Sequence, residues 1–110
     1  MKVLVCGGRN YTNADQLDQV LSGIARISMI IHGGARGADT LAGTWAQENG
    51  IAEVVVPAQW GLGRGAGILR NGWMLQLEPQ LVVAFPGGRG TANMVMQARR
   101  AGLEVYDVNG

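Results

Sequence analysis

Five short apolar runs recur along the chain, and most of them end in glycine, proline or a polar turn. Runs of this length, bounded by turn residues, are typical of buried β-strands. The last run is more polar than the others, which is typical of a strand at the edge of a sheet. The predicted strands are Lys2–Cys6, Ile27–His32, Glu53–Pro57, Leu81–Phe85 and Leu103–Val108.

Segments with helical periodicity lie between these runs. From Leu17 to Ile24, apolar residues follow the i, i+3, i+4, i+7 spacing of one face of an amphipathic helix. Thr12, with Asp15 three residues later, resembles a capping box at the start of this helix. Further helices are predicted over about Ala38–Asn49, with Gly50 as its C-terminal stop, over about Ala66–Leu77, and over Ala92–Ala101.

Strands that alternate with helices predict a parallel α/β sheet with right-handed crossovers. The length of 110 residues fits one domain, which we expect to span residues 1–110. Parallel sheets of this kind bind ligands beyond the carboxyl ends of their strands, where the strand order reverses. If the fourth strand lies next to the first, the loops after these two strands flank that point.

Three of the predicted strands run into loops rich in glycine and arginine. Glycine lets a ligand approach the main chain closely, and a free helix N-terminus attracts anions, most often phosphate. Thr91 is expected to cap the helix after the last of these loops. The loop residues predicted to bind a ligand are Gly7, Gly8 and Arg9; Gly33, Gly34, Ala35, Arg36, Gly37 and Asp39; and Pro86, Gly87, Gly88, Arg89, Gly90 and Thr91.

Arginine supplies nearly all of the positive charge, since eight of the nine basic residues are arginine. Its planar fork of donors suits phosphate better than the point charge of lysine. Arg64 and Arg70 lie in or beside predicted loops and join the loop arginines as candidate ligand contacts. Trp60 and Tyr11 lie in loops on the same edge and could stack on a base or pack at the rim instead.

Composition excludes several classes of function. A net charge of +1 does not favour nucleic acid as a partner, and no apolar run reaches the roughly 18 residues needed to span a membrane. One histidine and one cysteine give no set of metal ligands, and no cofactor is predicted. The single cysteine and the strand at the N-terminus favour a cytoplasmic location.

Carboxylates are scarce near the glycine loops, where Asp39 is the one acidic residue. Glycosidic hydrolysis normally needs two carboxylates, or an equivalent acid and base. Asp39 is therefore a weak catalytic candidate, and capping of a helix is the favoured role for it. His32 and Cys6 each end a strand, and we interpret both as structural residues.

The predicted helix Ala66–Leu77 is apolar on nearly every side. Such a helix is buried on several sides, which in a small chain indicates a subunit interface and a homo-oligomer. Coverage by a loop of the same chain is the alternative.

The motifs resemble those of the SLOG superfamily of Rossmann-like proteins, which includes the LOG phosphoribohydrolases and the DNA-processing protein A. The chain is most similar to the small YspA-like members. The resemblance depends on the segments Val5–Arg9, Ile31–Asp39, Arg70 with Asn71, and Ala84–Thr91. It implies a Rossmann-like three-layer sandwich with a five-stranded, mostly parallel sheet. It also implies a nucleotide derivative of the ADP-ribose type, linear or cyclic, with its phosphates on the loop Pro86–Thr91 and with Asn71 at the site.

One departure from the LOG pattern PGGxGTxxE bears on catalysis. Asn93 and Met94 occupy the positions where the catalytic acid would stand, so the acid that would accompany Arg70 is missing. The sequence therefore favours a binding protein, either a sensor or a sponge that sequesters the ligand. A LOG-like hydrolase that cleaves the N-glycosidic bond of nucleoside monophosphates is the alternative, and a binder of single-stranded DNA is a weaker one.

Overall fold

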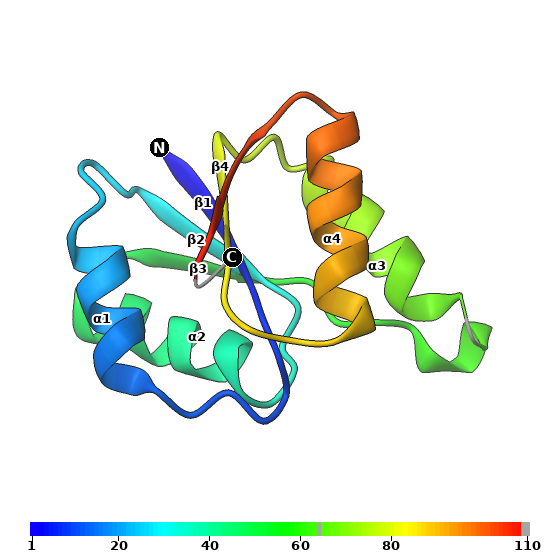
Figure 1. The fold of residues 1–110 in the computed structure, drawn as a ribbon, viewed down its shortest axis with the longest axis horizontal. Coiled ribbons are helices and arrows are strands. Elements are labelled where there is room, and N and C mark those ends of the chain that lie inside the picture. Colours follow the sequence, from blue (N-terminus) through cyan, green and yellow to red (C-terminus); the bar gives the residue numbers. More distant parts are fainter. Residues whose placement is uncertain (64, 109–110) are drawn as a thin grey trace.

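The computed structural model describes residues 1–63 and 65–108 as one five-stranded parallel sheet with helices on both faces (Figure 1). The strand order is β3-β2-β1-β4-β5, and all four neighbouring pairs are parallel. This is the predicted Rossmann-like sandwich. The strands are β1 (Lys2–Cys6), β2 (Met29–His32), β3 (Ala52–Val55), β4 (Leu81–Ala84) and β5 (Glu104–Asp107).

Helices α1 and α2 cover one face of the sheet, and α3 and α4 cover the other (Figure 1). Alternate residues of β1 divide between two cores: Val3 and Val5 pack toward α1 and α2, whereas Leu4 and Cys6 pack toward α3 and α4. The helical segments are α1 (Ala14–Ser22), α2 (Ala38–Glu48), the 3-10 turn η1 (Trp60–Leu62), α3 (Ala66–Leu75) and α4 (Arg89–Arg100).

The caps predicted for α1 and α4 are wrong. The N-cap of α1 is Asn13, whose side chain accepts the N–H of Gln16 at 3.0 Å, so Thr12 and Asp15 do not form the capping box. Helix α4 begins at Arg89, which puts Thr91 inside its first turn instead of at its cap. Gly88 takes the cap position because its carbonyl already accepts the N–H of Ala92 at 3.0 Å.

The third helix has an apolar side that the described chain leaves uncovered. Ile68 and Leu69 are 56% and 47% exposed, so no other part of the described chain covers this side of α3. Trp60 and Leu62 of η1 are also exposed. No helix among residues 1–63 and 65–108 is long and apolar enough to cross a bilayer.

The strand order reverses between β1 and β4, and this place is called the switch point below. There the main chains of the loops after these two strands contact each other. The N–H of Gly8 donates to the carbonyl of Pro86 at 2.9 Å, and the carbonyl of Gly8 accepts the N–H of Ala38 at 3.2 Å. Gly37 has φ of +81°, and a Cβ added to it would lie 2.1 Å from the carbonyl oxygen of Gly8. This contact requires glycine both for its backbone angle and for its lack of a side chain.

We therefore expect Gly37→Ala to destabilise the protein far more than Gly50→Ala. Gly50 has φ of +65° but open space around its Cα, so its substitution should cost only about 1–2 kcal/mol of left-handed strain. Gly37→Ala adds a backbone collision, and its free energy of unfolding should fall by at least about 2 kcal/mol more. Urea denaturation of both variants measures this difference, and equal losses would contradict the proposed packing.

Candidate functional site

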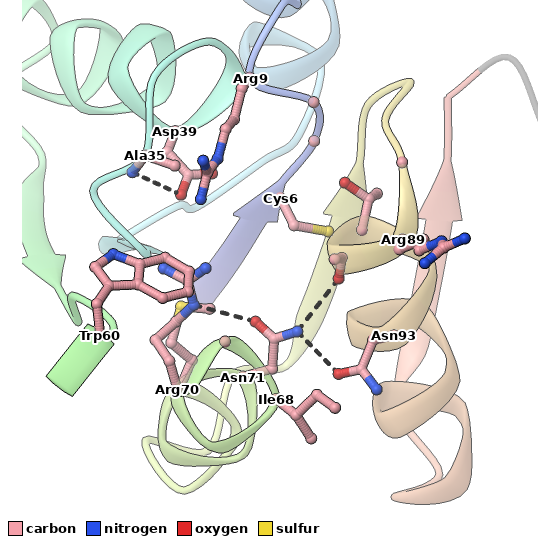
Figure 2. A pocket seen from close by; sticks show the side chains of 17 residues that line it. Cys6, Arg9, Ala35, Asp39, Trp60, Ile68, Arg70, Asn71, Arg89 and Asn93 are labelled. Carbon is pink, nitrogen blue, oxygen red and sulfur yellow. Dashed lines mark hydrogen bonds between the residues drawn. The ribbon is translucent and has the colours of Figure 1, made fainter. Parts of the chain in front are cut away.

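A cavity of about 750 Å³ opens at the switch point (Figure 2). Its volume lies in the range of small-molecule sites. The predicted residues that line it are Gly7, Gly8, Arg9, Ala35, Asp39, Trp60, Arg70, Asn71, Gly88, Arg89, Gly90 and Thr91. Five residues that the sequence reading missed also line it, namely Cys6, Gly67, Ile68, Met74 and Asn93.

A second cavity of about 230 Å³ adjoins the first, because Arg9, Ala35, Trp60 and Arg70 line both. The predicted residues Gly33, Gly34 and Arg36 line only the second cavity, together with Pro57 and Ala58. Pro86 and Gly87 instead line a third cavity of about 680 Å³, on the other side of their loop, and Gly37 lines none of the three. Arg64 lies outside the described residues.

Arginine dominates the charge of the first two cavities. Arg9, Arg70 and Arg89 line the first, and Arg36 joins Arg9 and Arg70 in the second. Among the described residues of these walls, Asp39 is the one carboxylate. The two cavities therefore favour an anionic ligand.

The loop after β2 uses its own N–H groups internally. One oxygen of Asp39, Oδ2, accepts the N–H of Gly33 at 3.0 Å and that of Ala35 at 3.2 Å. The N–H of Gly34 donates to Nδ1 of His32 at 3.0 Å. This loop therefore presents side chains to the cavities while these three amides hold its shape.

Asp39 thus braces the loop that precedes α2, and the prediction that it caps the helix is wrong, since Gly37 is the N-cap. Burial raises the pKa of Asp39, and the N–H of Ala35, His32, Arg70 and the N–H of Gly33 oppose that rise. Oδ2 is committed to two backbone donors, so this oxygen is poorly placed to accept a proton from a ligand.

His32 has a structural role, as interpreted from the sequence. Because its Nδ1 accepts a backbone N–H, the proton of the neutral ring lies on Nε2, which donates to Oε2 of Glu53 at 2.5 Å. The hydrogen bonds from His32 and Gln47 lower the pKa of Glu53. The pair links β2 to β3. It also fixes the imidazole ring of His32, whose Nδ1 accepts the N–H of Gly34.

Burial, with the charges of Asp39 and Asp107, raises the pKa of Cys6 to about 12. The thiol therefore stays protonated near neutral pH, which is the inert state of a small core residue rather than that of a nucleophile.

Arg70 is held from two directions. Its Nη1 donates to the carbonyl of Gly33 at 2.9 Å, and its Nε donates to Oδ1 of Asn71 at 3.3 Å (Figure 2). A Cβ on Gly33 would lie 2.0 Å from Nη1, so the guanidinium needs glycine at this position. Arg70 retains the donors of Nη2 at the wall that the two cavities share.

Trp60 is the aromatic side chain of this wall. It is 59% exposed, and the guanidinium carbon of Arg9 lies 5.5 Å from its ring centroid, a cation–π contact (Figure 2). Tyr11 instead packs on Phe85, with ring centroids 5.1 Å apart, and its hydroxyl bonds Gln16. Tyr11 therefore packs within the chain, whereas Trp60 offers a face to a ligand.

The first turn of α4 supplies main-chain donors. Its N-cap, Gly88, has no side chain to occupy the free N–H groups, and the first helical bond reaches Ala92. The N–H groups of Arg89, Gly90 and Thr91 are therefore available at a cavity wall that these residues form. Such a terminus attracts anions.

Comparison with known proteins agrees with the fold and with the glycine loops. The model of the YspA, cpYpsA-related SLOG family matches residues 1–63, which include the loops after β1 and β2 and also Trp60. The Gene 61 protein of Mycobacterium phage D29 is 34% identical over 122 residues, an alignment that covers 96% of this chain and 94% of that relative. The chain belongs to the YspA, cpYpsA-related SLOG family.

The bracing role of Asp39 predicts opposite effects for two substitutions. Asp39→Asn keeps an oxygen where Oδ2 accepts both N–H groups, so the protein should be at least as stable as the wild type at pH 7. Asp39→Ala leaves two donors without an acceptor and should cost roughly 1–3 kcal/mol for each of them.

The pH dependence of stability tests the same assignment. Because burial raises the pKa of Asp39 in the folded state, its ionised form costs stability above the unfolded pKa, and this cost disappears on protonation in acid. Any advantage of Asp39→Asn should therefore be largest at neutral pH and shrink as the pH approaches the ordinary carboxyl range. Urea denaturation at pH 7 and pH 4 measures it, and a loss equal to that of Asp39→Ala would contradict the bracing role.

Proposed function

We propose that the chain binds a phosphate-containing nucleotide derivative of the ADP-ribose type, linear or cyclic, and acts as a sensor or a sequestering sponge. The observation that carries the proposal is the set of four arginines around two adjoining cavities whose one described carboxylate is engaged by backbone amides. Membership of the SLOG family supports a nucleotide-related ligand.

The geometry supports separate positions for the parts of such a ligand. One phosphate suits the first turn of α4 with Arg89, and a second suits the smaller cavity, where Arg9, Arg36 and Arg70 converge. Trp60 lies between them on the shared wall and suits a planar base. A molecule with two phosphates and a base uses all three features, whereas a nucleoside monophosphate uses fewer.

Hydrolysis of an N-glycosidic bond, as in the LOG enzymes, is the competing function. Asp39 lines the first cavity with a raised pKa, but its Oδ2 accepts two backbone N–H groups. Met94 is fully buried in the core beside the sheet, and Asn93 lines the cavity in its place. We therefore favour binding of an intact ligand in a reducing, cytoplasmic compartment.

Arginine substitutions should weaken binding strongly. Arg89→Ala and Arg70→Ala each remove charge-assisted hydrogen bonds worth roughly 1.5–3 kcal/mol, which corresponds to about a 10- to 150-fold loss of affinity. Isothermal titration with ADP-ribose, cyclic ADP-ribose and AMP measures this loss. Arg100→Ala is the matched control, since it removes the same charge at the opposite end of α4.

The fate of the ligand separates the two functions. Mass spectrometry after incubation and denaturation should recover the bound species intact. Release of free base or ribose phosphate, lost in Asp39→Asn, would establish hydrolysis instead. Unchanged affinity in both arginine variants would show that the site lies elsewhere.

We also propose that the chain forms a homo-oligomer through the segment Ala66–Leu77 and the adjoining η1. The support is an exposed apolar surface formed by Trp60, Leu62, Ile68 and Leu69. An exposed apolar cluster of this kind is typical of protein–protein contacts.

The oligomer should depend on the exposed apolar side chains of α3. Sedimentation equilibrium of the wild type should give a multiple of 11.6 kDa, and Leu69→Glu should shift it toward the monomer mass, because a carboxylate cannot be buried unpaired. Met96→Glu, at an exposed apolar position of α4, is the control and should leave the mass unchanged. A monomeric wild type would overturn this part of the proposal.

A further inference from the structure

We propose that Asn93 presents the N–H₂ end of its amide to the ligand and selects a hydrogen-bond acceptor, such as a phosphate oxygen, one helical turn beyond Gly90. This inference rests on the proposed function, because it assigns one contact in the same cavity. Asn93 is half-buried and lines that cavity one turn beyond Gly90.

The orientation of the Asn93 amide follows from two main-chain carbonyls. The carbonyl of Gly90 accepts at 3.2 Å from Asn71, so the Asn71 atom there must be its donor, Nδ2. The carbonyl of Ile68 accepts at 3.2 Å from Gln97, so that atom must be Nε2. A carbonyl can only accept, and each amide is therefore fixed independently of Asn93.

Both of these donors also contact Asn93. Nδ2 of Asn71 lies 3.0 Å from one Asn93 amide atom, and Nε2 of Gln97 lies 2.7 Å from the same atom. Two donors must meet an acceptor, so that atom is Oδ1 (Figure 2). Arg70 supports the arrangement from the other end, because its Nε donates to Oδ1 of Asn71.

The opposite end of the Asn93 amide is consequently Nδ2, and in Figure 2 it points away from Asn71. The described residues include no buried side-chain nitrogen or oxygen atom without a partner, so Nδ2 reaches solvent. Asn71 is 5% exposed and has donors or acceptors at both ends of its amide, which makes it a rigid support for Asn93.

The arrangement has a chemical consequence for recognition. Asn93 adds two N–H donors to a wall that already contains Arg89 and the free amides of the first turn of α4. A carboxylate at position 93 would keep both internal acceptor bonds and lose both donors. Asn93 is thus a specificity-determining residue for a ligand that offers acceptors and no donors at this point.

Asn93→Asp tests the inference with little structural change, since its oxygens still accept from Asn71 and Gln97. It should keep the thermal unfolding temperature close to that of the wild type and weaken ADP-ribose binding about 10-fold or more. Ala92→Asp is the control for charge alone. It puts a carboxylate at the adjacent position of α4, which lines the third cavity, and should change affinity less than about 3-fold.

Five outcomes are informative. Selective weakening by Asn93→Asp supports the inference, as does a shift of the Asn93 side-chain amide signals in a ¹⁵N spectrum titrated with ADP-ribose. Equal weakening by Asn93→Asp and Ala92→Asp, or unchanged binding in Asn93→Asp, would overturn the inference while leaving the proposed function intact. Absence of ADP-ribose binding by the wild type would overturn the proposed function and this contact together.

Discussion

The contact of main chain with main chain beyond the carboxyl ends of β1 and β4 is the constraint on which the site depends. Gly8 donates to Pro86 and accepts from Ala38, while Gly37 lies so close to Gly8 that no side chain fits between them. These contacts join three loops from three different strands. They hold the start of α4 and the start of α2 around one cavity, so the cavity owes its shape to backbone geometry more than to side-chain packing.

A set of hydrogen bonds within the loop after β2 determines which N–H donors remain for a ligand. Gly33, Gly34 and Ala35 donate their N–H groups to Asp39 and His32, and Glu53 in turn fixes His32. These three amides of the loop after β2 are therefore engaged within the chain. In the proposed function, recognition therefore falls to the arginine side chains, to the first turn of α4 and to the amides beside it. Glycine thus has two roles here, since some glycines permit close packing and others leave a helix end uncapped.

Much of the fold could be predicted from the sequence, because apolar runs mark the strands and glycines mark the loops that follow them. The runs that became β1 and β4 predicted a switch point between them, and the strand order confirms their adjacency. Helix ends were harder to predict. Thr12 and Thr91 have good capping side chains, but Asn13 and Gly88 take the cap positions once the backbone turns are formed. Competition between neighbouring residues for one cap depends on loop geometry that local sequence does not specify.

The loops of the candidate site could be predicted from the sequence. The hydrogen bonds among its side chains could not. Arg9, Arg70 and Arg89 were expected at the cavity because arginine beside glycine loops is typical of anion sites, and all three line it. Asn93 was considered only as the replacement for an acid. Its bond to Gln97 lies within α4, four residues on, but its bond to Asn71 spans 22 positions and depends on how α3 packs against α4. The one signal in the sequence that Asn93 lines the cavity was its position, one helical turn after Gly90.

The central position of β1 has a consequence for how the chain is made. Its two neighbours, β2 and β4, pair with it across very different spans: Val3 lies opposite Ile30 on one side and Leu81 on the other. A nascent chain can complete the first half of the sheet long before the second neighbour leaves the ribosome. Until then one edge of β1 stays unpaired, and pairing at that edge must close a loop of nearly eighty residues. The same pairing brings the loops after β1 and β4 together, so the candidate cavity between them cannot form before it.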